Sequence, residues 1–271
     1  MDRYALFGQA VSQSLSPRIH QRFAEQTQQS LTYTAQSVAP ELFPQVLESF
    51  FATGGQGANI TAPFKTVAAR YVDQLTPAAQ LGAVNTVLPL GDGRLLGDNG
   101  DGIGLVKDLQ RQQLLLPGAR ILLIGAGGAA RGILLPLLAT QPAEVVLLNR
   151  TLATAAQLAA ECTKLGPVKI AQPQRLHHGV FDLVIQATSA RSLDALHPWL
   201  ASLRWEAAAC YDLNYQPNTT PFLQWARQQG ASRLSDGLGM LVEQAAYAFQ
   251  CWRQVLPSVE ALLHTLRREL A

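Results

Sequence analysis

The sequence predicts an α/β protein of two domains, and three observations lead to this fold class. The chain has 271 residues, of which 48% are hydrophobic; this is enough for one large or two modest cores, and the length favours two domains. Short apolar strands alternate with helical segments through the second half, which indicates a parallel sheet covered by helices on both faces. A glycine-rich loop at 125–130 joins one of these strands to a helix.

The first half predicts a mixed α/β domain. A strand at 4–8 is followed by a helix that begins at Ser16-Pro17, since Ser suits an N-cap and Pro lacks the N–H that would be orphaned there. Thr61 to Pro63 predicts a second such start after a strand at 57–60. Asp92-Gly93 between two apolar runs predicts a β-hairpin. The other expected elements are strands at 31–38, 84–90 and 95–98 and a helix at 41–52.

The second half is more regular. Strands are expected at 121–124, 144–148, near 168, at 183–185 and at 208–211, with helices at 129–138 and 153–161. Two further helices are expected over 239–270.

Composition and charge exclude several classes of protein. The formal net charge of +2, without a run of Lys or Arg, argues against a nucleic-acid-binding surface. No apolar run approaches the roughly 20 residues of a membrane helix, and the N-terminus enters a strand without the layout of a signal peptide, so a cytoplasmic protein is expected. The cysteines fit no metal-ligand spacing and are interpreted as free, buried thiols; they are Cys162, Cys210 and Cys251.

The glycine-rich loop matches the G-x-G-x-x-G/A pattern that lets a backbone approach a pyrophosphate at a helix N-terminus. Such a string is weak evidence alone, and its place between a strand and a helix strengthens it. The second half is therefore predicted to be a Rossmann-type domain. The loop residues expected to bind the cofactor are Gly125, Ala126, Gly127, Gly128 and Ala129.

The end of the next strand indicates which dinucleotide is used. NAD enzymes place an acid there for the ribose 2′-hydroxyl, whereas this chain has Asn149-Arg150-Thr151. An Arg can stack on adenine and pair with a 2′-phosphate, so NADP is favoured. The alternative is that Arg150 is a solvated charge at a strand end.

Several strings, in this order, resemble the motif series of shikimate dehydrogenases, and the resemblance covers essentially the whole chain. They are Ser14-Leu15-Ser16-Pro17, Asn59 to Lys65, Gly82 to Thr86, Gly97 to Gly102, Gly125 to Ala130, Asn149 to Thr151, Asp212 to Tyr215 and Gly237 to Leu241 with Gln244.

The resemblance implies NADPH-dependent reduction of 3-dehydroshikimate to shikimate, with Lys65 and Asp101 as the catalytic pair. It implies a substrate domain at 1–101, an inserted NADP domain at 102–236, and helices at 237–271 that return to the substrate domain. Substrate-binding roles fall on Ser14, Ser16, Thr61, Asn85, Tyr215 and Gln244, and Thr188 and Gly237 join the cofactor site.

The chemistry supports these residue types. Hydride delivery to a ketone creates alkoxide character on its oxygen, and a Lys supplies both a proton and a positive charge there. Serine hydroxyls suit a carboxylate, which only accepts hydrogen bonds. Each residue also has a plainer interpretation: Ser16 and Thr61 as helix caps, Lys65 as a solvated charge one turn into a helix, Asp101 as a helix N-terminal acid, and Gln244 as a core amide.

The chain also departs from the family pattern. Gly100 stands where Thr is usual, Thr154 where many NADP-dependent members carry a second Arg, and Gln186 to Arg191 replaces an Asn-Ala-Thr-Ser-x-Gly loop. The alternatives are a paralogue acting on quinate or a related hydroxy acid, possibly with NAD, or a nicotinamide-binding regulator that has lost turnover. No metal, nucleic-acid or membrane partner is expected, and the state is expected to be a monomer or homodimer.

Overall fold

The computed structural model describes residues 1–171, 176, 179–188 and 197–270, and it divides into two compact units. The first unit comprises Met1–Gly104 and Leu241–Arg267, and the second comprises Leu105–Met240 and Arg268–Ala271. The chain passes from the first unit to the second within helix α4 (Asp101–Arg111) and returns within helix α10 (Leu238–Arg253).

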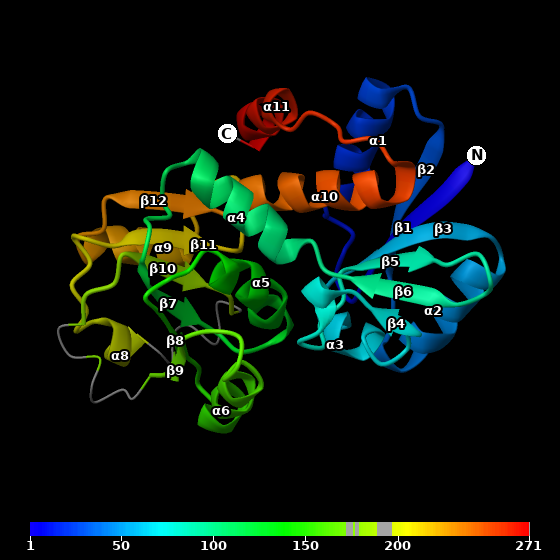
Figure 1. Ribbon diagram of the computed structural model, residues 1–271. Coiled ribbons are helices and arrows are strands. Elements are labelled where there is room, and N and C mark those ends of the chain that lie inside the picture. Colours follow the sequence, from blue (N-terminus) through cyan, green and yellow to red (C-terminus); the bar gives the residue numbers. More distant parts are fainter. Residues whose placement is uncertain (172–175, 177–178, 189–196, 271) are drawn as a thin grey trace. The chain divides into compact units, whose positions relative to one another are not determined.

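The first unit contains a mixed six-stranded sheet in the order β2-β1-β3-β5-β6-β4 (Figure 1). Strand β1 pairs in parallel with both β2 and β3, whereas β5 is antiparallel to β3 and β6. The expected hairpin is therefore confirmed. The strands are β1 (Asp2–Gly8), β2 (Leu31–Ser37), β3 (Gly55–Ile60), β4 (Gln74–Leu75), β5 (Thr86–Pro89) and β6 (Leu95–Asp98).

Helices bury apolar side chains against this sheet. Phe43 and Phe64 stack with ring centroids 4.3 Å apart in a cluster that includes Phe7 and Ile60 from the strands. Burial of aromatic side chains contributes strongly to such a core. Besides α4 and α10, the helical elements of this unit are α1 (Ser16–Thr27), η1 (Pro40–Leu42), α2 (Phe43–Ala52), α3 (Lys65–Ala68), η2 (Pro77–Ala79) and most of α11 (Glu260–Leu270).

The second unit contains a six-stranded, wholly parallel sheet in the order β12-β11-β10-β7-β8-β9 (Figure 1). Read from β9, this is the doubly wound order 3-2-1-4-5-6 when the strands are numbered from β7, and the strand order reverses between β7 and β10. The predicted α/β fold with a Rossmann-type domain is confirmed. The elements are β7 (Arg120–Ile124), α5 (Gly128–Ala139), β8 (Glu144–Leu148), α6 (Leu152–Glu161), β9 (Val168–Ile170), β10 (Leu183–Gln186), α8 (His197–Leu200), β11 (Ala209–Asp212), α9 (Pro221–Gln228) and β12 (Arg233–Asp236).

Three local predictions are wrong. Ser16 is the first residue of α1 and not its N-cap, and the hydroxyl of Ser14 accepts the N–H of Ser16 instead. Thr61 does not cap α3, because that helix starts at Lys65 and its N-cap is Phe64. Lys65 is consequently at the start of the helix and not one turn into it.

All three cysteines are free, and Cys162 and Cys210 are buried as expected, whereas Cys251 is partly exposed. Within the described residues, no helix has the length and apolar character needed to cross a membrane. The same residues contain no cluster of three or more His, Cys, Asp or Glu side chains suited to a metal ion.

Candidate active site

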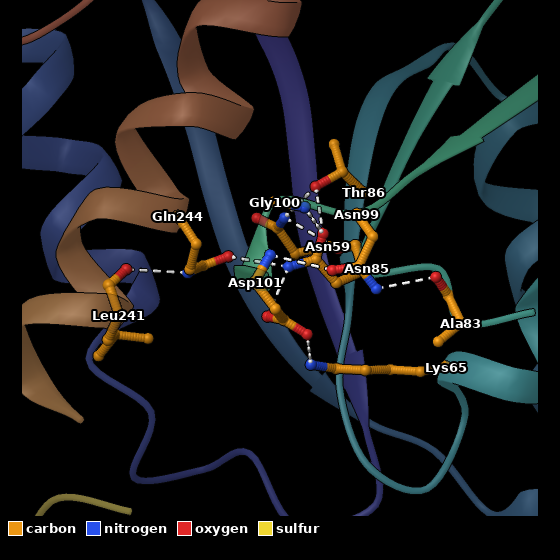
Figure 2. A network of polar contacts seen from close by, with 10 residues as sticks. All are labelled: Asn59, Lys65, Ala83, Asn85, Thr86, Asn99, Gly100, Asp101, Leu241 and Gln244. Atoms are coloured by element: carbon orange, nitrogen blue, oxygen red, sulfur yellow. Dashed lines mark hydrogen bonds and ion pairs between the residues drawn. The ribbon is translucent and has the colours of Figure 1, made fainter. Parts of the chain in front are cut away.

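Lys65 and Asp101 form an ion pair in the first unit (Figure 2). Lys65 begins α3 after strand β3, and Asp101 begins α4 after strand β6. Only 15% of the Lys65 side chain and 6% of the Asp101 side chain are exposed. Because the pair is shielded from water, the two charges interact more strongly than they would on the surface.

Asn85 holds the second oxygen of this carboxylate. Its amide nitrogen donates to Asp101 Oδ1 at 2.8 Å, and its amide oxygen accepts the backbone N–H of Gly100 at 2.9 Å. A backbone N–H can only donate, so the orientation of the Asn85 amide is fixed. Both oxygens of Asp101 are therefore held in place by donors.

Figure 2 shows how Gln244 and Asn59 extend this network. Gln244, on α10, accepts from the Asn85 amide nitrogen at 3.2 Å and donates to the carbonyl of Leu241 at 2.9 Å. Asn59, at the end of β3, donates to the carbonyl of Asn85 at 3.1 Å. Such fully satisfied buried networks hold their members rigidly. Gln244 is thus a buried amide whose oxygen and nitrogen each have a partner.

The segment Asp98 to Asp101 is held by its own side chains. The amide oxygen of Asn99 accepts the N–H of Asp101 at 2.9 Å, and its nitrogen donates to the carbonyl of Ala83 at 2.8 Å. Asp98 accepts from the hydroxyls of Thr76 and Tyr247, the latter at 2.7 Å. The start of α4, and with it Asp101, is thus fixed from several sides.

The hydroxyls predicted to bind substrate lie at the carboxyl ends of the parallel strands β1 and β3. Ser14 and Ser16 lie side by side, with hydroxyl oxygens 3.2 Å apart. A Cβ at Gly8, the last residue of β1, would lie 2.5 Å from the Thr61 methyl group and 2.5 Å from a methyl group of Val11. Gly8 therefore allows the two loops to approach each other. An ion pair and hydrogen bonds thus join Lys65, Asp101, Asn85 and Gln244 in one network. Ser14 and Ser16 form a separate pair of hydrogen-bonded hydroxyls.

In the second unit, the glycine loop lies at the point where the strand order reverses. Gly125 follows β7 with φ +120°, and a Cβ there would lie 2.9 Å from both the carbonyl oxygen of Ala187 and the methyl carbon of Thr188. Only glycine suits this conformation and this approach. Crevices at such reversal points are where open α/β sheets bind their ligands.

The residues around this loop fit a phosphorylated dinucleotide. Gly127 is the N-cap of α5 and has no side chain that could accept from the first N–H groups of the helix. A Cβ built on Gly127 would have no described atom within 4 Å. The first turn of α5 contains no acidic residue, so its positive end suits a pyrophosphate. At the end of β8, Arg150 is exposed, and Asn149 holds the turn by donating to the Thr151 carbonyl at 2.8 Å.

Thr188, Gly237 and Tyr215 follow β10, β12 and β11, which end at the same edge of the parallel sheet. Asn214 donates to the Thr188 carbonyl at 3.3 Å, and Gly237 donates its N–H to the Asn214 carbonyl at 3.0 Å. Tyr215 is half-buried beside Asn214 in the chain. Gln186 hydrogen-bonds the Thr188 backbone, whereas residues 189–191 of the same loop lie outside the described residues.

Four side chains of this network have no role assigned from the sequence, although Thr86 and Asn99 stand within the motifs; the four are Tyr33, Thr86, Asn99 and Tyr247. Tyr33 donates to the Asn59 amide oxygen at 2.8 Å, and Thr86 donates to that of Asn85 at 2.8 Å. A polar residue at the start of an apolar strand is the available signal for Thr86. No sequence signal marks Tyr33 or Tyr247, because their partners are distant along the chain.

Three family models match the chain. One described as the shikimate dehydrogenase substrate binding domain matches residues 6–87, and one described as shikimate / quinate 5-dehydrogenase matches residues 108–198. A third, described as the shikimate 5′-dehydrogenase C-terminal domain, matches residues 237–267.

Full-length relatives give the same result. The shikimate dehydrogenase (NADP(+)) of Cellvibrio japonicus is 50% identical over 270 residues, which cover 99% of this chain and 98% of that protein. The structure of an Ael1 enzyme from Pseudomonas putida has a TM-score of 0.86 and 41% identity, with 98% of each chain covered. The shikimate 5-dehydrogenase of Thermus thermophilus, in complex with NADP(H) and shikimate, has a TM-score of 0.83 and 30% identity, with 100% of each chain covered.

Proposed function

This chain belongs to the shikimate dehydrogenase family, and we propose that it catalyses the reversible NADPH-dependent reduction of 3-dehydroshikimate to shikimate. This reaction lies on the route to chorismate and the aromatic amino acids. The observation that carries the proposal is the shielded Lys65–Asp101 pair, held by Asn85. We assign substrate binding to 1–101 with 237–271 and NADP binding to 102–236. A cytoplasmic location stays a prediction.

Lys65 is proposed as the proton donor. The reduction adds a hydride to the ketone carbon and a proton to its oxygen, and bound NADPH supplies the hydride. An ammonium has three N–H donors, and within the described part of the chain the Lys65 ammonium donates to Asp101 alone. Its remaining donors can therefore face the substrate oxygen, give it a proton, and be reprotonated from water. In the reverse direction the neutral amine takes the hydroxyl proton.

Asp101 is proposed to orient the Lys65 ammonium and the substrate hydroxyls, and Asn85 is proposed to hold Asp101 and to bind the substrate. Ser14, Ser16 and Thr61 supply hydroxyl donors for the substrate carboxylate, and Tyr215 and Gln244 bind carboxylate or ring hydroxyls. Ser16 is buried at the start of α1, where the positive end of a 12-residue helix supports binding of an anion.

NADP binding is assigned to one edge of the parallel sheet. The glycine loop would hold the pyrophosphate, and Arg150, with Asn149 and Thr151, would hold the adenosine 2′-phosphate. Thr188 and Gly237 would line the nicotinamide side. One of the matching family models names quinate beside shikimate, which makes quinate the alternative substrate.

Substitution Lys65→Ala tests the central residue. We expect kcat to fall about 10²- to 10⁴-fold, the usual contribution of a positioned acid or base, while NADPH binding is kept and shikimate binding survives in part. Steady-state rates and calorimetric titrations measure the two effects. Lys164→Ala, which removes an exposed lysine of the second unit, is the matched control and should leave kcat unchanged. A wild-type kcat in Lys65→Ala would remove Lys65 from the reaction.

A further inference from the structure

Gly100, next to Asp101, has no room for a side chain. A Cβ at this position would lie 2.7 Å from Cδ1 of Tyr247 and 3.5 Å from the carbonyl oxygen of Gln244. Real Cβ atoms do not approach a ring carbon as closely as 2.7 Å, so either Tyr247 or the backbone at Gly100 would have to move. The ring of Tyr247 fills the space beside Gly100.

The Tyr247 ring is not free to move aside, because its hydroxyl is held. It donates to Asp98 Oδ2 at 2.7 Å, and Asp98 is buried with 4% of its surface exposed. Burial, and then the hydrogen bond to Asp98, raise the pKa of Tyr247 above its usual value, so the phenol stays protonated and donates. The carbonyl of Asp98 accepts the N–H of Asn85 at 3.0 Å, which ties the same strand end to the site.

Gln244 and Tyr247 are three residues apart on α10 and so lie on one face of that helix. Gln244 accepts a hydrogen bond from Asn85, and Tyr247 donates one to Asp98. The ring of Tyr247 also lies where a side chain on residue 100 would be. Helix α10 therefore meets the segment Asp98 to Asp101 directly through Tyr247. It meets the segment indirectly through Asn85, which bonds both Gly100 and Asp101. Asp101 is the last residue of this segment, so a shift of Gly100 moves its carboxylate directly.

We propose that Tyr247 is a positioning residue for Asp101 and that Gly100 and Tyr247 act as a matched pair. The ring occupies the volume that a side chain at residue 100 would take, and the hydroxyl anchors Asp98. The segment that carries Asp101 is thereby set by α10. This proposal rests on the proposed role of Asp101 in shikimate oxidation and reduction.

A double-mutant cycle tests the pairing. Gly100→Ala is expected to lower kcat about tenfold or more, since displacement of a catalytic group by about 1 Å can cost about 10²-fold. In the Tyr247→Ala background the same Gly100→Ala change is expected to alter kcat by less than about twofold. Gln250→Ala, which changes an exposed residue of α10, is the control and should match the wild type. Equal effects of Gly100→Ala in both backgrounds would overturn the pairing.

Tyr247→Phe tests the hydroxyl separately. We expect kcat to fall several-fold and the midpoint of the pH–rate profile to move, with KM for shikimate and NADP affinity close to the wild type. A loss of folded protein would lower the rate equally at every pH and leave the midpoint of the pH–rate profile unchanged. Counting active sites by NADPH titration corrects for that loss. An unmoved profile with wild-type kcat per site would overturn the positioning role.

Failure of the proposed function gives a different result. If folded wild-type protein did not oxidise shikimate with NADP, the function would be contradicted whatever the variants did. The pairing would then be decided by urea unfolding of the wild type, the two single variants and the double variant. Non-additive free energies of unfolding support it, and additive ones overturn it.

Discussion

Among the individual residues, His20 on α1 shows most directly how burial sets a charge state. It is 1% exposed and stacks on Tyr33, with ring centroids 4.1 Å apart and an interplanar angle of 7°. Burial lowers the pKa of His20 from its ordinary 6.5 to about 3, so the imidazole is neutral in the folded protein at neutral pH. Tyr33 donates a hydrogen bond to Asn59, so His20 packs against a residue that belongs to the hydrogen-bond network of the candidate active site.

This charge state predicts a pH dependence of stability. As the pH falls from 6.5 towards 3, the unfolded chain binds a proton at His20 that the folded protein cannot bind, so the free energy of unfolding falls. One proton corresponds to a slope of at most about 1.4 kcal/mol per pH unit. Between about pH 6.5 and about pH 4, we expect the free energy of unfolding to fall by about 2–3 kcal/mol less in His20→Leu than in the wild type. Urea unfolding at each pH measures this difference.

His264→Leu, which replaces an exposed histidine on α11, is the control and should keep the wild-type slope. Parallel curves for His20→Leu and the wild type would show that His20 binds its proton equally well in the folded and unfolded chains, which would contradict the lowered pKa. Absolute stabilities are not decisive here, because the substitution also changes packing.

Sequence reasoning finds some residues of the site and misses others for a physical reason. Lys65, Asp101 and Asn85 are found through the family resemblance, and they stand at the starts of α3 and α4 and just before β5. Tyr247 lies in the middle of α10 and meets Asp98 across 149 positions of the chain. A contact of that kind is set by packing between distant elements and leaves no local signal.

At the scale of elements, the two glycines of the loop before α5 have different tasks. Gly125 is required by the fold, because of its φ of +120° and its closeness to Ala187 and Thr188. Gly127 has an ordinary φ of −84° and open space where its Cβ would be, among the described residues. Its task is therefore proposed to be the approach of a pyrophosphate.

Alanine at each position separates these tasks. Gly125→Ala should destabilise the protein by about 1–3 kcal/mol, the cost of an unfavourable backbone conformation for a residue with a Cβ. Gly127→Ala should unfold at the wild-type urea concentration and yet bind NADP more weakly in a calorimetric titration. A Gly127→Ala variant with wild-type affinity would contradict the assignment of this loop, and an unchanged stability of Gly125→Ala would contradict the stated strain.

Element types are more predictable from sequence than element boundaries. The strands of the second unit follow from their apolar runs, and β8 has the predicted bounds of Glu144–Leu148. Helix α1 begins at Ser16 as expected. The next helix is expected from Pro63 but begins at Lys65, because serine and threonine near proline also serve in turns that precede a helix. Helix α9 is not expected from the sequence although Thr220 caps it through the N–H of Leu223, because its 8 residues are too few for a clear periodicity.

At the scale of the whole chain, the fold class was predictable because two independent patterns agree. Strand–helix alternation predicts the parallel sheet of the second unit, and the glycine loop marks its first strand; the doubly wound strand order comes from the structure. The return of the C-terminal helices to the first unit is implied by the resemblance alone. Hydrophobic periodicity predicts a helix and its apolar face, but it does not predict which part of the chain that face packs against. The predicted domain boundaries stay a proposal.

The most direct test of the account is an activity matrix of two substrates and two cofactors. Shikimate or quinate is offered with NADP or NAD to folded wild-type protein and to Arg150→Ala, and initial rates are read at the reduced-nicotinamide band. We predict the highest kcat/KM for shikimate with NADP, and a loss in Arg150→Ala that is much larger with NADP than with NAD. Folded protein that binds NADP yet turns over neither substrate with either cofactor would contradict the proposed dehydrogenase activity.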